Sequence, residues 1–151
     1  MPNYWLMKSE PYVYSIDDLN KDGTTYWEGV RNYAARNNMR AMEVGDMVLY
    51  YHSQAKPPGV VGLARVSRKA YPDHFAWEPG HKYFDAKSSE ENPRWSMVDV
   101  EFVEKFPHEV SLPDIKAMPE LAEMVLVRRS RLSVQPVLPA EYDRIVAMGR
   151  G

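Results

Sequence analysis

The 151-residue sequence contains no cysteine, which excludes disulfide bonds and cysteine-ligated metal sites. It also lacks any apolar run close to the roughly 20 residues that a helix needs to span a bilayer. The N-terminus shows neither the basic nor the apolar region of a secretory signal peptide. We therefore expect a cytoplasmic protein without a membrane partner.

Common cofactor and catalytic motifs are missing as well. The chain has neither the glycine-rich phosphate loops of nucleotide-binding enzymes nor the Gly-x-Ser-x-Gly turn of serine hydrolases. Its four histidines do not have the i, i+4 spacing of a helical zinc site. His74 and His81 lie near Asp73 and Asp85 in the sequence, but we interpret this stretch as a solvated loop. We expect no cofactor and no metal ion.

Aromatic residues are abundant, with 4 Trp, 10 Tyr and 4 Phe making up 12% of the chain. So much aromatic surface must lie in a core, in a binding pocket or in both. The formal net charge is only −2, yet residues 31–69 hold seven basic and two acidic side chains, a local charge of +5. Residues 125–137 add three arginines and no acidic residue. Such patches are either solvated surface or contacts for phosphate groups. Acidic residues elsewhere on the protein repel a phosphate at such a patch only weakly, because salt screens charges that lie far apart.

The pattern of apolar residues and turns predicts a single domain, residues 1–151, of class α+β. Strands are predicted where β-branched and aromatic residues gather or alternate with polar ones, at 3–10, 46–52, 60–66, 96–103 and 132–137. Short helices are predicted after capping residues or a leading proline, at 15–21, 30–42, 111–124 and from 139 onward. Residues 71–94 are predicted to form a long surface excursion. Five or six strands with helices between them favour a curved mixed sheet or a small barrel, and periodicity alone does not close the barrel.

Three clusters of aromatic and polar residues lie where strands are predicted to end or a helix to begin, at 8–10, 27–33 and 50–53. Aromatic planes stack on nucleic-acid bases, while serine, asparagine and backbone groups hydrogen-bond base edges. Any one of these aromatic side chains, taken alone, is better explained as a core residue. The combination favours a pocket for an extruded base.

The same clusters resemble the motifs of the EVE domain, the family of the thymocyte nuclear protein and its bacterial relatives, within the PUA-like superfamily. The matching stretches, which together reach across nearly the whole chain, are Tyr4–Pro11, Trp27–Arg36, Tyr51–Ser53, Gly59–Gly62 and Arg131–Pro136. Because the sequence begins directly with the domain, it resembles the bacterial stand-alone form. The resemblance implies a PUA-like curved mixed β-barrel of five to six strands with flanking short helices, and kinship with YTH and ASCH domains. It also implies recognition of modified bases in DNA or RNA.

Carried over to this sequence, the resemblance places a base pocket among the residues of these motifs. The candidate pocket residues are Ser9, Trp27, Arg31, Asn32, Tyr33, Tyr51, His52, Ser53 and Trp95, the last as a second wall for a base stacked on Trp27. The basic residues predicted to contact phosphates are Arg36, Arg40, Lys56, Arg128, Arg129 and Arg131. YTH domains have a cage tryptophan after Gly-Val, where this chain has Arg31, so a specificity for methyladenine does not carry over.

Two other functions stay open at this point. ASCH relatives that are amidohydrolases suggest a small hydrolase acting on a modified nucleoside, with Lys8, Ser9, Glu10 or His52 taking part in the reaction. Adjacent residues on a regular strand point to opposite faces, however, which argues against Ser9 and Glu10 sharing one site. A pocket for a small metabolite or a protein partner is the third interpretation. The leading hypothesis is a non-catalytic module that binds DNA or RNA through one base.

Overall fold

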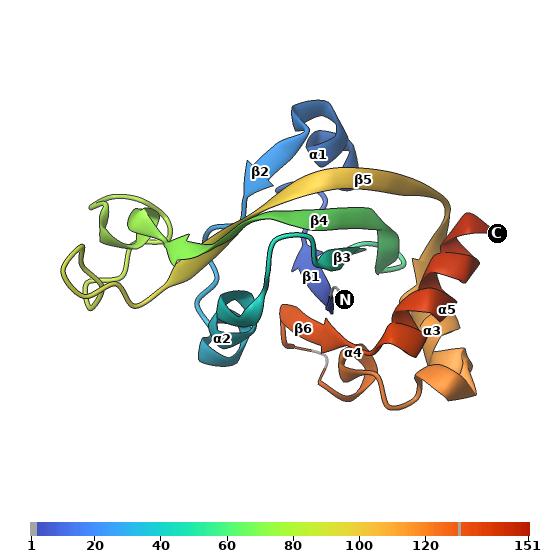
Figure 1. Ribbon diagram of the computed structural model, residues 1–151. Helices are drawn as coiled ribbons and strands as arrows, with labels where there is room; N and C mark the ends of the chain where they lie inside the picture. Colours follow the sequence, from blue (N-terminus) through green and yellow to red (C-terminus); the bar gives the residue numbers. More distant parts are fainter. Residues whose placement is uncertain (1–2, 130) are drawn as a thin grey trace.

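The computed structural model describes residues 3–129 and 131–151. Within them, six strands form one mixed sheet in the order β2-β5-β4-β3-β1-β6 (Figure 1). The strands are β1 (Tyr4–Ser9), β2 (Thr24–Tyr26), β3 (Met47–His52), β4 (Gly59–Pro72), β5 (Ser96–Ser111) and β6 (Val134–Val137). β1 and β3 are parallel, and the other four pairings are antiparallel. The predicted α+β class is confirmed.

Short helices flank this sheet, and their starts follow the local sequence. They are α1 (Ile16–Asp22), α2 (Tyr33–Ala41), α3 (Leu112–Ala117), α4 (Val125–Arg128) and α5 (Pro139–Arg150), with single 3-10 turns η1 (His74–Trp77) and η2 (Pro119–Leu121). The Ser15 hydroxyl accepts a hydrogen bond from the amide of Asp18, whose carboxylate accepts from the amide of Ser15, so the predicted capping box opens α1. None of the helices in the described residues is long and apolar enough to cross a membrane.

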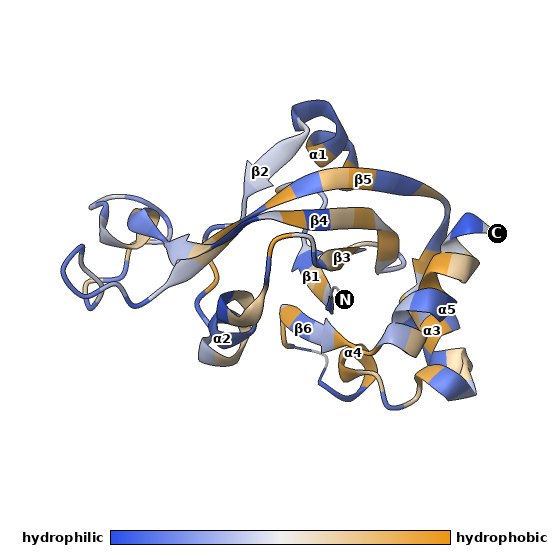
Figure 2. Ribbon diagram, viewed as in Figure 1, coloured by the Kyte–Doolittle hydropathy of each residue, from blue (hydrophilic) through white to orange (hydrophobic). Residues whose placement is uncertain are grey.

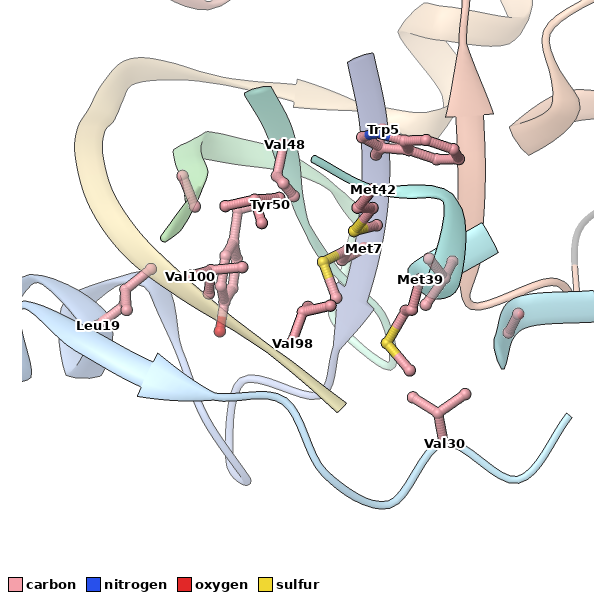
Figure 3. Packing of buried hydrophobic residues seen from close by; sticks show 14 of the residues in the cluster. Trp5, Met7, Leu19, Val30, Met39, Met42, Val48, Tyr50, Val98 and Val100 are labelled. Atoms are coloured by element: carbon pink, nitrogen blue, oxygen red, sulfur yellow. The ribbon is translucent and has the colours of Figure 1, made fainter. Parts of the chain in front are cut away.

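The two faces of the sheet support two hydrophobic cores. Met7 and Tyr50 belong to the first core, which packs against α1 and α2 (Figure 3). Leu6 and Leu49 belong to the second, which packs against α3, α4 and α5. Successive residues of a strand point to opposite faces, so neighbours in sequence contribute to different cores. This alternation decides which side chains can reach a site on the α1 and α2 side.

The sheet is not closed into the barrel that the resemblance implied. Its edge strands β2 and β6 each pair with one neighbour among the described strands. Helix α2 lies between β6 and the start of β5, because the Asn38 side chain donates to Val134 O at 2.7 Å and Arg40 Nε donates to Ser96 Oγ at 2.9 Å. A helix rather than strand pairing therefore connects β5 and β6 on this side of the sheet. Register shifts along the β4–β5 pair let the sheet curve strongly without closure.

Residues 73–95 form the predicted excursion between β4 and β5. They project from one end of the sheet (Figure 1) and are coloured largely blue and white on the hydropathy scale (Figure 2). Strand β4 is longer than predicted, since it continues with the start of β5 as a two-stranded ribbon to the pairs Tyr71↔Met97 and Pro72↔Ser96. Strand β5 is longer at its other end, where it runs on to Ser111 beside the start of β4. Pairing along this ribbon does not need the apolar alternation on which the prediction relied.

Candidate functional site

A cavity of about 800 Å³ opens beside the first core, within the range of typical ligand sites. Two segments provide most of its lining, residues 8–14 at the end of β1 and residues 22–31 around β2. Ser53, Lys82, Tyr83, Asp99 and Ser133 complete it. The cavity thus gathers parts of all three polar clusters identified in the sequence.

The parallel pairing of β1 and β3 brings two of these clusters together. The carboxyl ends of parallel strands lie at the same edge of a sheet, and here the amide of Ser53 donates to Ser9 O at 3.0 Å. Strand β1 ends at Ser9, and the amide of Tyr14 donates back to Glu10 O at 3.0 Å in the turn that follows. Ser9 and Glu10 therefore both line the cavity, contrary to the opposite-face argument made for a regular strand.

Trp27 forms a wall of the cavity and rests on the first core. Its indole ring packs edge-on against Tyr50, with ring centroids 5.5 Å apart and an interplanar angle of 80°. The Tyr50 hydroxyl donates to Tyr14 O at 2.8 Å, and the Ser9 hydroxyl donates to the same oxygen at 2.8 Å. The fully buried Tyr50 thereby fixes two parts of the lining relative to each other.

The segment Gly29–Arg31 holds the excursion against the cavity. The buried carboxylate of Asp73 accepts from the amide of Gly29 at 2.9 Å and from Arg31 Nη1 at 3.0 Å. Arg31 Nη2 donates to Tyr83 O at 2.7 Å. Gly29 has φ +83°, and a Cβ at this position would lie 2.4 Å from Tyr83 Cζ, so the ring requires glycine here. Arg31 lines the cavity, but its guanidinium is already engaged in holding Tyr83 in place.

Trp95, Tyr33 and Asn32 lie at the junction between α2 and the excursion, outside the cavity lining. Trp95 is 5% exposed, and its indole donates to Asp85 Oδ2 at 2.6 Å. Its ring stacks on Tyr33 with centroids 4.9 Å apart. The Asn32 side chain accepts from the amide of Ala35 and caps α2. The structure therefore does not place Trp95 opposite Trp27 across one cleft, because its ring packs against α2.

Tyr51 and His52 also lie away from the large cavity. Tyr51 is 3% exposed and belongs to the second core, on the other face of the sheet. His52 lines a separate cavity of about 310 Å³ together with Lys105 and Glu109. Its Nε2 accepts from the amide of Ile16 at 3.1 Å, and burial lowers its pKa. His52 therefore lies apart from Lys8, Ser9 and Glu10, the other residues of the hydrolase interpretation, which line the large cavity together.

Two of the predicted phosphate contacts lie together beside the Tyr33–Trp95 stack. Arg36 Nη1 donates to Arg94 O at 3.0 Å, and the Arg36 guanidinium lies 4.7 Å from the centroid of the Tyr33 ring. Arg40 extends the group along α2. We call Arg36, Arg40 and Arg94 the arginine patch. The other predicted contacts lie elsewhere: Arg128 is paired with Glu123 at 2.5 Å, and Lys56, Arg129 and Arg131 are exposed.

Several lining residues were not among the predicted pocket residues. Lys8 and Glu10 were named only for the hydrolase interpretation, and no local pattern distinguished Glu28 within its cluster as a pocket residue. Tyr83 lies 52 residues from its partner Arg31, and no sequence pattern connects the two. Burial lowers the pKa of Lys8 and raises that of Glu28. Burial and the hydrogen bond to Asp22 raise the pKa of Tyr14 to about 12, so this hydroxyl keeps its proton.

The histidines of the excursion participate in aromatic packing. The His81 ring stacks on Phe75 with centroids 4.7 Å apart, and His74 Nδ1 lies 3.4 Å from Glu78. Among residues 3–129 and 131–151, no group of three or more metal-ligating side chains is close enough to hold a metal ion.

Comparison with known proteins shows the same architecture in relatives. The EVE domain family matches residues 3–148. Human thymocyte nuclear protein 1 is 40% identical over an alignment 167 residues long, which covers 98% of this chain and 74% of that protein. A hypothetical protein from Leishmania major is 53% identical, with a TM-score of 0.95 over 99% of this chain and 95% of that one. Human THYN1, solved in complex with DNA containing 5-methylcytosine, is 40% identical, with a TM-score of 0.94 over 99% of this chain and 98% of that one. The chain therefore belongs to the EVE domain family, as its sequence motifs predicted.

Proposed function

We propose that this protein binds nucleic acid by holding one modified or extruded base in the 800 Å³ cavity at Trp27. The observation that carries the proposal is this cavity, in which a partly exposed tryptophan adjoins serine and carboxylate side chains. A human relative of the same fold, solved with 5-methylcytosine DNA, supports DNA as the nucleic acid. A base extruded from its stack needs an aromatic surface and hydrogen-bonding groups for its edge, and the lining offers both.

The charge of the lining favours a base over a phosphate group. Three basic side chains, those of Lys8, Arg31 and Lys82, share the cavity with four acidic ones. A phosphate would meet this surplus of negative charge, whereas an uncharged base would not. The flanking phosphates instead reach the arginine patch, which adjoins the cavity through Trp95, since the Arg31 guanidinium lies 5.5 Å from the centroid of that ring. Four of the predicted pocket residues then act as supports that hold the excursion and the patch in position, namely Arg31, Asn32, Tyr33 and Trp95.

Replacing Trp27 tests the proposal. Stacking of a base on an aromatic side chain is worth about 1–3 kcal/mol, so Trp27→Ala should weaken binding of an oligonucleotide with one 5-methylcytosine by roughly 5- to 150-fold. Fluorescence polarisation with otherwise identical methylated and unmethylated oligonucleotides measures this loss. Phe84→Ala is the matched control, because Phe84 is 45% exposed and does not line the cavity.

Two results would contradict the proposal. The first is a wild-type protein that shows no preference across oligonucleotides carrying modified cytosines and adenines. The second is a Trp27→Ala variant that unfolds at the wild-type temperature and binds as tightly as the wild type.

A further inference from the structure

Three of the four acidic side chains in the cavity are engaged by tyrosine hydroxyls. Tyr14 donates to Asp22 Oδ2 at 2.7 Å, and Tyr71 donates to Asp99 Oδ1 at 2.5 Å. Tyr12 donates to Glu10 Oε2. These carboxylates have protein partners, which leaves less of their acceptor capacity for a bound molecule.

Glu28 is the fourth acidic residue, and it is differently placed. It follows Trp27 directly and is partly buried at the cavity wall. In the part of the chain that the structure describes, its carboxylate receives no hydrogen bond from another residue. The nearby charges are those of Asp73, which raises the pKa of Glu28, and of Lys82 and His81, which lower it. Burying a carboxylate is costly unless a donor compensates, and an occupant of the cavity can supply that donor.

We propose that Glu28 accepts a hydrogen bond from the exocyclic amino group of the bound base and thereby selects cytosine-type or adenine-type bases over thymine and uracil. This inference rests on the proposed function and adds a substrate class to it. Thymine carries the same C5-methyl group as 5-methylcytosine, so a methyl contact alone cannot separate the two bases. They differ at position 4, where cytosine has an amino donor and thymine a carbonyl acceptor. A carboxylate accepts from the amino group and repels the carbonyl oxygen, so it discriminates where the methyl contact does not.

The first test uses the wild-type protein alone. Three single-stranded oligonucleotides, identical except for one central 5-methylcytosine, cytosine or thymine, are compared by fluorescence polarisation. Single strands remove the unequal cost of opening a G·C or an A·T pair. We expect the 5-methylcytosine strand to bind about 5- to 150-fold more tightly than the thymine strand. Equal binding of these two strands overturns the inference while leaving base binding intact, whereas binding of none of the three refutes the proposed function.

The second test replaces the carboxylate with an amide of the same shape. In Glu28→Gln, the side chain can donate to the thymine carbonyl or accept from the cytosine amino group. The ratio of the affinities for the 5-methylcytosine and thymine strands should therefore fall close to one. Glu120→Gln is the matched control with the same change in charge, because Glu120 lies 3.5 Å from Arg144 and does not line the cavity. A Glu28→Gln variant that unfolds normally and keeps the wild-type ratio also overturns the inference.

Discussion

Asp73 is a fully buried carboxylate that organises the excursion around the cavity. It accepts from the amides of Gly29 and Phe75 and from the guanidinium of Arg31, whose side chain is 23% exposed. The ion pair therefore connects segments 42 residues apart. Removing one partner of a buried pair leaves the other charge uncompensated, which costs more than losing an exposed pair.

At this residue scale, Asp73→Asn should lower the free energy of unfolding by about 2–4 kcal/mol. Urea unfolding followed by tryptophan fluorescence measures the change. The matched control is Glu101→Gln, since Glu101 pairs with Arg65 at 2.6 Å on the surface and should lose less than about 1 kcal/mol. Losses of equal size in the two variants would show that the Asp73 pair contributes no more than a surface ion pair.

At the scale of elements, His52 connects the end of β3 to the start of α1. Its Nε2 accepts from the amide of Ile16, and only the neutral imidazole can accept this hydrogen bond. Burial lowers the pKa of His52 below 6.5, with Lys105 acting in the same direction and Asp17 and Asp18 opposing. The position of α1 thus depends on the protonation state of one histidine.

The stability of the fold should consequently depend on pH through His52. The pKa of His52 is lower in the folded than in the unfolded state. Its contribution to the free energy of unfolding is therefore complete above pH 6.5 and is lost as the pH falls through the folded-state pKa. Denaturant unfolding of the wild type and of His52→Gln between pH 8 and pH 5 measures it, and the difference between the two curves should narrow on acidification. Parallel curves would contradict the prediction.

At the scale of the whole molecule, a net charge of −2 argues against unspecific coating of nucleic acid, and the proposed phosphate contacts are confined to the arginine patch. If its three arginines each neutralise one phosphate of duplex DNA, affinity should fall roughly 40-fold between 50 and 200 mM salt. The Arg36→Ala variant should reduce the salt slope by about 1, and Arg144→Ala on α5 should leave it unchanged. A loss of affinity above roughly 1,000-fold over this salt range would indicate six or more phosphate contacts and a wider interface.

Most of the elements and the positions of the polar clusters could be predicted from the sequence, because capping residues and apolar periodicity are local. The short strand β2, which lines the cavity, and the short helix α4 were not predicted. The sequence did not predict the full lengths of β4 and β5. The end of β4 is held by pairing rather than by burial, and the end of β5 buries only the separated residues Phe106 and Val110. It also did not predict that α2 fills the gap between β5 and β6, since that depends on contacts such as the one between Asn38 and Val134.

Some features of the candidate site could likewise be predicted from the sequence, and others depend on the tertiary structure. The sequence by itself determined the family, the cluster around Trp27 and the serines that the parallel strands β1 and β3 bring together. Only the tertiary structure decided that Trp27 lines the cavity while Trp95 packs against α2, and that Tyr50 supports the wall while Tyr51 lies on the other face. It also brought in Tyr83 and left Glu28 without a donor from another residue in the described chain. The physical reason is that side-chain types and periodicity are local, whereas the orientation and partners of a side chain depend on strand register and on contacts between distant segments.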